Sequence, residues 1–198
     1  MLTQKGILIK RSFDVFLSFS GLLLFFLPII ILIVASTISF NKFGLFRQVR
    51  IGLNGKKFWI LKIRSMEDDE ESDSLTLEND PRINNYGRFL RKTKMDELPQ
   101  LWNVLIGDMS LVGPRPDVPG YADKLTGEDR VILSVRPGIT GPATLKYRSE
   151  EQILAAQKNP KEYNDKVIWK DKVEINKNYV KNWTLKNDIR VLFDTFFS

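Results

Sequence analysis

The chain contains no cysteine and no histidine among its 198 residues. Without cysteine there is no disulfide framework, no thiol nucleophile and no zinc–thiolate site. Without histidine there is neither an imidazole base nor an imidazole metal ligand, so any catalysis must use carboxylates, lysine, tyrosine or hydroxyl groups. A metal held only by carboxylates and phosphate oxygens is a hard cation, and the two absences therefore favour Mg²⁺.

Acidic residues are outnumbered, 24 against 30 Lys and Arg, which gives a formal net charge of +6. This excess favours an anionic partner, either a polyphosphate substrate or an anionic membrane surface. The same charge would suit nucleic acid, but no recognised nucleic-acid-binding motif is present, and we predict no such partner. The length suffices for one compact domain with an appendage and hardly for two full domains.

Charge is missing altogether from residues 15–41, whose middle reads LLLFFLPIIILIVA. Such a run is long enough to cross a bilayer, which takes roughly 20 apolar residues, and too long for a signal peptide. Basic residues flank it on both sides, Lys10 before and Lys42 after, although positive charge prefers the cytoplasmic side. Pro28 near its centre kinks a helix. The pattern favours a re-entrant helix that returns to the cytoplasm, with a simple span as the alternative.

The stretch from residue 91 to 116 concentrates charged groups around an apolar run. Asp96 and Glu97 precede residues 98–106, which have helical periodicity, and Gly107 is a plausible stop. Asp96 is therefore predicted to begin a helix, whose free N–H groups and partial positive charge would suit a phosphate. An acidic pair in a first helical turn is, however, also an ordinary complement of the helix dipole.

Arg115 lies between two prolines in the sequence GPRP. Because each proline fixes its own φ, this loop suits an arginine that presents its guanidinium to phosphate oxygens. Upstream, Asn54-Gly55 between two β-prone runs predicts a hairpin. Lys62 and Arg64 fall on one side of the second strand, which is either an exposed face or one placed beside the acidic pair.

The remaining chain is predicted to be mostly helical. Residues 67–80 are acidic and poor in apolar residues, which is typical of a mobile loop or a short polar helix. Residues 86–91 and 121–135 have helical patterns, and 143–148 are expected to form a short strand. Residues 150–158 and 167–183 are amphipathic and suit either a membrane interface or a packed helix with one solvated face.

Taken together, these blocks resemble the bacterial sugar transferases, the monotopic polyprenyl-phosphate hexose-1-phosphate transferases that initiate glycan assembly. The main block reads DPRINNYGRFLRKTKMDELPQLWNVLIGDMSLVGPRP, and it is joined by KRSFD, FRQVRIG, KIRSM and RPGITG. The resemblance covers essentially the whole chain and corresponds to the small, catalytic-core form. It implies an α+β fold, mostly α. An N-terminal re-entrant membrane helix, broken at Pro28, would occupy 1–43, and a cytoplasmic catalytic domain with a short β-hairpin would occupy 44–198.

The resemblance also implies a chemistry at the inner membrane of a bacterium, on its cytoplasmic face. Asp96 would attack the β-phosphate of a UDP-sugar, releasing UMP, and polyprenyl phosphate would then take the sugar phosphate from the aspartate. Asp96 and Glu97 would bind Mg²⁺, and the phosphates would be bound by Lys62, Arg64, Arg91 and Arg115. Membrane lipids are further expected partners, and a homodimer is left open.

Two rival functions remain at this point: a membrane-bound lipid phosphatase and a non-catalytic membrane scaffold. The chain departs from the family pattern after RPGITG, where residues 142–148 read PATLKYR. This departure leaves the identity of the transferred sugar open.

Overall fold

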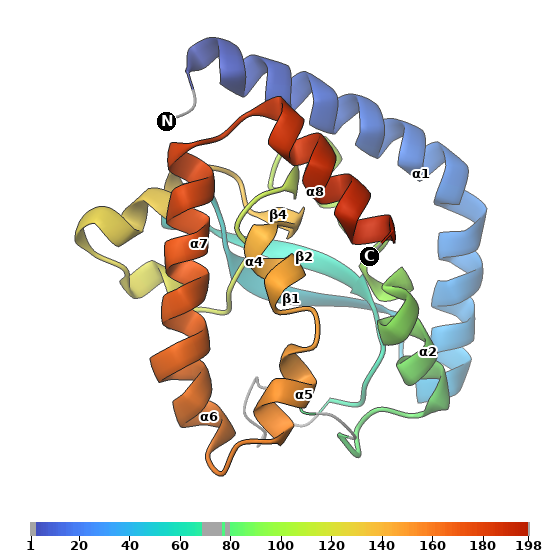
Figure 1. Cartoon of the computed structure of the whole chain (residues 1–198). Helices are drawn as coiled ribbons and strands as arrows, with labels where there is room; N and C mark the ends of the chain where they lie inside the picture. Colours follow the sequence, from blue (N-terminus) through green and yellow to red (C-terminus); the bar gives the residue numbers. More distant parts are fainter. Residues whose placement is uncertain (1–2, 69–76, 78–79, 198) are drawn as a thin grey trace.

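The structure is a computed structural model that describes residues 3–68, 77 and 80–197. Its first element is α1, Gln4–Phe40, which begins at a Thr3 side-chain cap, contains Pro28 and ends at Asn41 in the left-handed region. α1 curves along one side of the molecule (Figure 1). By length and composition it could cross a membrane. The expected apolar helix with a central proline is therefore present.

The N-terminal end of α1 is attached to the rest of the chain through buried polar groups. Lys10 Nζ pairs with Asp188 of α8 (Leu185–Phe197) at 2.6 Å. The guanidinium of Arg11 donates to Val104 O and Leu105 O, at 2.6 and 2.7 Å, near the end of α3 (Gln100–Ile106). Cations are favourable at a helix C-terminus, where carbonyls lack intrahelical partners. These contacts fix α1 against both α3 and α8.

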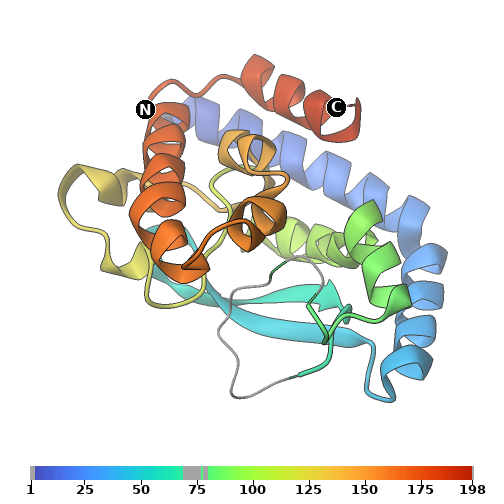
Figure 2. The same cartoon turned by 60° about the horizontal axis from the view of Figure 1, so that its bottom comes forward.

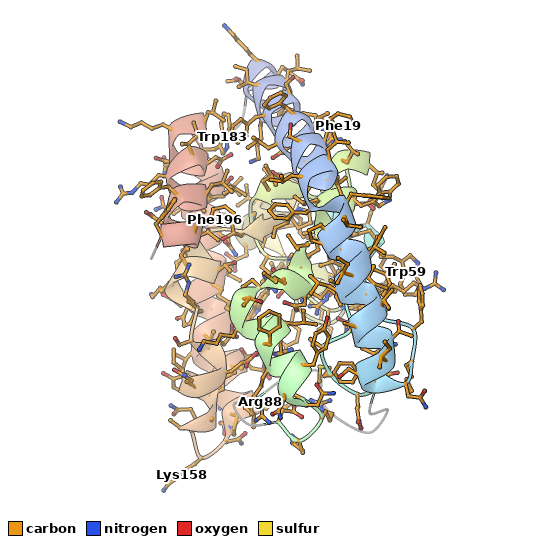
Figure 3. The ribbon with its side chains drawn as sticks, turned by 90° about the vertical axis from the view of Figure 1, so that its right-hand side faces the viewer. Phe19, Trp59, Arg88, Lys158, Trp183 and Phe196 are labelled. Atoms are coloured by element: carbon orange, nitrogen blue, oxygen red, sulfur yellow. The ribbon has the colours of Figure 1, made fainter. Side chains whose placement is uncertain are left out.

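The C-terminal end of α1 contacts the same body at other points. Ser36 Oγ donates to Arg64 O at 2.7 Å, and Tyr86 Oη donates to Leu32 O at 2.9 Å. Between the two attachments, α1 exposes large apolar side chains such as Phe19 (Figure 3). α1 is therefore attached through polar contacts at both ends, and the exposed apolar surface between them suits contact with lipid.

The strands β1 (Leu45–Ile51) and β2 (Lys57–Ile63) form the expected antiparallel hairpin. The turn η1, Leu53–Gly55, has φ of +57° at Asn54 and +78° at Gly55, the conformation for which an Asn-Gly pair is suited. The hairpin prediction is confirmed. Figure 2 shows the hairpin on the side of the molecule opposite α8.

Two helices flank the acidic pair. α2, Asn85–Thr93, confirms the expected helix around residues 86–91, and it ends at Lys94 with φ of +57°. The 3-10 turn η2, Met95–Glu97, follows, and α3 ends at Gly107, which has φ of +98° as the predicted stop requires. The prediction that Asp96 begins this helix is wrong. Pro99 caps α3, because successive 3-10 turns bend the chain before the α-helical hydrogen bonds begin.

Beyond α3, a short parallel pair was not anticipated. β3 (Ser110–Val112) pairs with β4 (Gly138–Thr140). The backbones approach so closely that a Cβ at Gly141 would lie 2.2 Å from Gly113 O, so only glycine fits there. This pairing fixes the start of the GPRP loop.

Two local predictions after β3 require correction. The helix expected at 121–135 is instead two 3-10 segments, η3 (Ala122–Lys124) and η4 (Gly127–Ser134), because the backbone is extended between them and Gly127, the first residue of η4, has a positive φ. The strand expected at 143–148 is the helix α4, Pro142–Lys146. Proline at the first helical position and alanine next to it favour a helix.

The C-terminal part is helical, as expected. It comprises α5 (Glu150–Ala155), α6 (Pro160–Tyr163), the π-helical turn η5 (Asn164–Ile168), α7 (Trp169–Lys181) and α8. The main core joins β2, α3, the β3–β4 pair, α7 and α8. Its buried residues are Ile60, Val104, Met109, Leu111, Val112, Val135, Tyr179, Val180 and Val191. Most of the expected acidic segment at 67–80 lies outside the described residues.

Candidate active site

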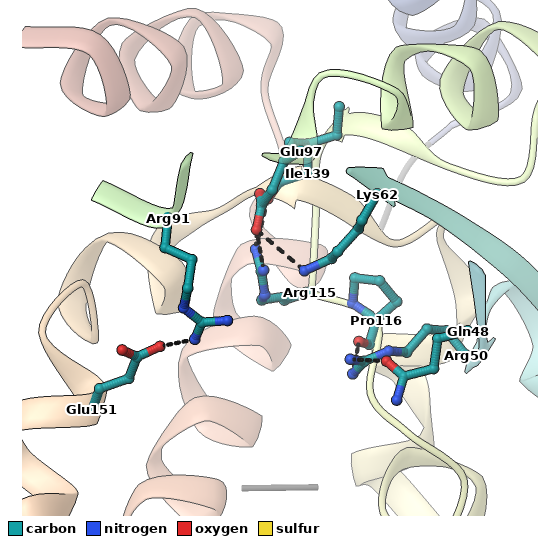
Figure 4. Close-up of polar contacts among 9 residues, drawn as sticks. All are labelled: Gln48, Arg50, Lys62, Arg91, Glu97, Arg115, Pro116, Ile139 and Glu151. Carbon is teal, nitrogen blue, oxygen red and sulfur yellow. Dashed lines mark hydrogen bonds and ion pairs between the residues drawn. The ribbon is translucent and has the colours of Figure 1, made fainter. Parts of the chain in front are cut away.

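Asp96 and Glu97 are both buried, at 5% and 8% exposure, in the turn η2. Glu97 is held by two cations. Arg115 Nη2 contacts Glu97 Oε1 at 2.5 Å, and Lys62 Nζ lies 3.5 Å from the same oxygen (Figure 4). The structure therefore brings together four of the residues that the sequence singled out, from β2, η2 and the GPRP loop.

The charges in this cluster change one another's proton affinity. Burial alone would raise the pKa of Glu97, but Arg115 and Lys62 lower it well below its ordinary value. Burial lowers the pKa of Lys62 to about 8, although Glu97 acts in the opposite direction. Glu97 is thus anionic at neutral pH and is neutralised by its own neighbours, whereas Lys62 remains mostly protonated there and loses its proton above about pH 8.

Asp96 differs from Glu97 in how its carboxylate is hydrogen-bonded. Its Oδ1 is buried and has no hydrogen-bond partner within the described part of the chain. Burial raises the pKa of Asp96, and Lys62 opposes this effect. A buried acceptor without a partner costs free energy, and such groups occur where a ligand or a reaction uses them. Asp96 is therefore the carboxylate of the pair that is available for chemistry.

Arg115 projects from the loop after β3, as the two prolines predicted. Its Nη1 donates to Ile139 O at 3.2 Å, which leaves the guanidinium fixed between β4 and Glu97. The charge of Glu97 raises the pKa of Arg115 above its ordinary value. The side chain remains 39% exposed, so its guanidinium can contact a ligand as well as Glu97.

Two other predicted phosphate-binding residues have partners of their own. Arg91, in the last turn of α2, pairs with Glu151 of α5 (Figure 4), and its charge acts on Asp96. Arg64 pairs instead with Asp68 at 2.6 Å and stacks over Phe46, 5.4 Å from the ring centre. The charge of Arg91 thus reaches Asp96 while its guanidinium pairs with Glu151, and the guanidinium of Arg64 is bound by Asp68.

Arg50 is a neighbour of the site that the sequence analysis missed. Its guanidinium donates to Pro116 O at 3.2 Å and to Gln48 Oε1 at 2.6 Å, while its buried Nε has no partner among the described residues. Counting outward from the Asn-Gly turn places Arg50 on the same strand face as Lys62, so the register was a usable signal.

Asp117, immediately after the GPRP loop, was also missed. Burial raises its pKa to about 7, against the opposing charges of Lys172, Arg50 and Arg115. Nothing in the local sequence signals this, because Lys172 comes from α7 and only the tertiary fold brings it near. The site therefore includes two cations, Arg50 and Lys172, and one acid, Asp117, that were not predicted from the sequence.

The carboxylate oxygens of Asp96 and Glu97 can supply only some of the ligands that a metal ion needs. No group of three or more potential ligands from Asp, Glu, His or Cys is found among the described residues. Asp96 Oδ1 is one carboxylate oxygen without a hydrogen-bond partner among the described residues, whereas the Glu97 oxygens face Arg115 and Lys62. Mg²⁺ commonly takes one or two carboxylates, water and substrate phosphates. The residues fit a Mg²⁺ ion bound through Asp96 together with a phosphorylated substrate.

The match to known proteins covers nearly the entire chain. Residues 5–198 match the family model described as "Bacterial sugar transferase". The chain belongs to the bacterial sugar transferase family. The match thus extends from the start of α1 through the Asp96–Glu97 site to α8, so the membrane-type helix is part of the family domain.

Three relatives illustrate its place in this family. The chain is 37% identical over 188 residues to the uncharacterized sugar transferase EpsL of Bacillus subtilis, covering 93% of this chain and 84% of that protein. It is 36% identical over 203 residues to the exopolysaccharide production protein PSS of Rhizobium leguminosarum, covering 97% and 95%.

The third relative is the UDP-glucose:undecaprenyl-phosphate glucose-1-phosphate transferase of Escherichia coli, 34% identical over 198 residues and 96% of this chain. The chain spans only 39% to 40% of the length of longer relatives such as this one.

Proposed function

We propose that the chain transfers a sugar 1-phosphate from a UDP-sugar to a polyprenyl phosphate such as undecaprenyl phosphate, as the first membrane step of polysaccharide assembly. The observation that carries this proposal is Asp96, a buried carboxylate with a free oxygen among fixed cations. Family membership and the substrates named for the Escherichia coli relative support it.

The chemistry needs a nucleophile and compensation for phosphate charge. Asp96 attacks the β-phosphorus of the donor, the bond to the bridging oxygen breaks, and UMP leaves with that oxygen. A phosphate oxygen of the polyprenyl acceptor then attacks the same phosphorus, and the Asp96 carboxylate is restored. Lys62 and Arg115 would bind phosphoryl oxygens. This assignment is supported by their position at the acidic pair, where both contact Glu97, and by the exposure of their side chains, 20% and 39%.

Mg²⁺, bound through Asp96 and the donor phosphates, would supply further neutralisation of phosphoryl charge. In this arrangement Glu97 holds Lys62 and Arg115 in place and keeps them charged, which differs from the direct ligand role that the sequence suggested. Chelation of Mg²⁺ is therefore expected to abolish UMP release, and Mg²⁺ alone should restore it.

We further propose that α1 is re-entrant, with the active site on the cytoplasmic face. Its 37 residues would extend roughly 56 Å if straight, beyond the roughly 30 Å of a bilayer core. Its two ends both contact the same body, through Lys10 and through Ser36. A helix spanning the bilayer would separate these contacts across the membrane. Because the chain lacks cysteine, Thr3→Cys and Lys57→Cys can be labelled singly in intact cells. Protection of both from an impermeant reagent is expected, and labelling of Thr3→Cys alone would show a span.

A panel of UDP-sugars with polyprenyl phosphate and Mg²⁺, scored for UMP, tests the transfer itself. We expect release of UMP to depend on one UDP-sugar, and mass spectrometry to find a sugar phosphate on Asp96 when the acceptor is omitted. Phosphate release from polyprenyl phosphate without a nucleotide sugar would instead indicate a lipid phosphatase. A cellular role that survives Asp96→Asn would indicate a scaffold.

A further inference from the structure

Two carboxylates of helix α5 form ion pairs with cations near the site. Glu151 pairs with Arg91 of α2, and Glu150 contacts Lys172 of α7 at 2.6 and 2.7 Å. Both acids lie in the first turn of α5, so one short helix carries the two carboxylates.

Both pairs lie within electrostatic reach of the reactive groups. The charge of Arg91 acts on Asp96, and the charge of Glu150 acts on Arg115 and on Asp117. The carboxylates are accessible to solvent, since the side chain of Glu151 is 44% exposed and that of Glu150 is 28% exposed. Ion pairs with this exposure contribute little to stability and can exchange partners readily.

We propose that Glu151, with Glu150 beside it, is an internal competitor for the phosphate-binding cations. Phosphate oxygens of the donor replace the carboxylate on Arg91 when the nucleotide binds, and the carboxylate returns as UMP leaves. A carboxylate and a phosphate present similar oxygens to a guanidinium, so one can substitute for the other. This inference rests on the proposed function, because it assigns Arg91 to the nucleotide phosphates.

Equilibrium binding of UDP and of UMP to the full chain in lipid nanodiscs, with Mg²⁺ and at fixed ionic strength, tests the competition. Glu151→Gln removes the competing charge and should tighten both ligands about threefold, since a partly exposed pair is being broken. The KM for the UDP-sugar should fall by a similar factor, and inhibition by UMP should become stronger. Glu150→Gln should act in the same direction.

The matched control is Glu162→Gln on α6, because Glu162 pairs with the exposed Lys166 and not with a residue of the site. It should leave both affinities unchanged. The effect of Glu151→Gln should also vanish in an Arg91→Gln background, because the carboxylate then has no cation to release.

Unchanged or weaker binding of UDP by Glu151→Gln would overturn the inference, because it would show that Glu151 orients Arg91 for the ligand. Binding is measured without turnover, so its result tests the competition by Glu151 independently of the proposed transfer reaction. Tighter UDP binding in a chain that releases no UMP would contradict the proposed function alone, and normal transfer without tighter binding would contradict the competition alone.

Discussion

Two buried ionic clusters in this chain differ in how completely their carboxylates are paired. Asp188 accepts from Lys10 Nζ at 2.6 Å, from Tyr179 Oη at 2.7 Å and from Trp183 Nε1 at 2.9 Å. Asp96 is buried to a similar degree, yet its Oδ1 has no partner among the described residues. The first cluster is satisfied by the fold itself, whereas the second is not.

This difference indicates a structural role for Asp188 and a chemical role for Asp96. A buried network with all its members satisfied fixes one arrangement of the elements that contribute to it, here α1, α7 and α8. A buried carboxylate left unpaired costs stability and is retained where the reaction needs its oxygen. Asp96→Asn should therefore reduce activity without reducing stability, whereas Asp188→Asn should reduce stability with little change in activity.

The largest effect is expected for Asp96→Asn. Loss of the nucleophilic oxygen should reduce sugar-phosphate transfer by roughly a thousandfold or more, measured as UMP release. Stability should stay equal or rise. Because the folded-state pKa of Asp96 is raised, ionisation disfavours the folded state. This cost grows as pH rises from the ordinary pKa to the raised one, stays constant above it, and is removed by a neutral amide. A marked fall in the melting temperature of this variant would contradict the comparison.

Asp188→Asn should do the reverse, with a smaller effect. It removes the carboxylate that pairs with the buried ammonium of Lys10 at 2.6 Å and leaves only the more distant charge of Asp14, and breaking a buried pair typically costs about 3 kcal/mol. Denaturation in lipid nanodiscs should show this loss, and Lys10→Met in the same background should recover part of it. Transfer per folded molecule should change little at a temperature where the variant is folded. Full stability with lost activity would place Asp188 in the reaction instead.

The local parts of the site could be predicted because they depend on neighbours in sequence. The Asn-Gly turn, the acidic pair and the GPRP loop each carry a short-range signal, and Lys62, Glu97 and Arg115 do meet. The apolar run likewise predicted the helix at the N-terminus.

The features that could not be predicted depend on tertiary packing. Arg64 directly follows β2 and pairs with Asp68, a partner that the strand pattern does not indicate, and its phosphate-binding role stays a prediction. The charge of Lys172 acts on Asp117 only because the fold brings α7 near the loop after β3, although the two residues are 55 positions apart. The β3–β4 pair, with only 3 residues in each strand, is too short for a periodicity to be recognised.

The smallest expected effect concerns Lys62, which contacts the satisfied carboxylate Glu97 and lies next to the unsatisfied one. Burial lowers its pKa to about 8, so above that pH the free enzyme loses a phosphate-binding charge, and kcat/KM for the UDP-sugar should fall about tenfold for each further pH unit. Folding is not the cause, because between about 8 and the ordinary 10.5 the unfolded chain binds more protons at this lysine and stability rises with pH. Lys62→Arg keeps its charge and should shift this decline to higher pH, whereas Lys166→Arg on the surface should not. A decline that stays near pH 8 in Lys62→Arg would show that another group titrates there, and Asp117, whose pKa is about 7, would be the next to test.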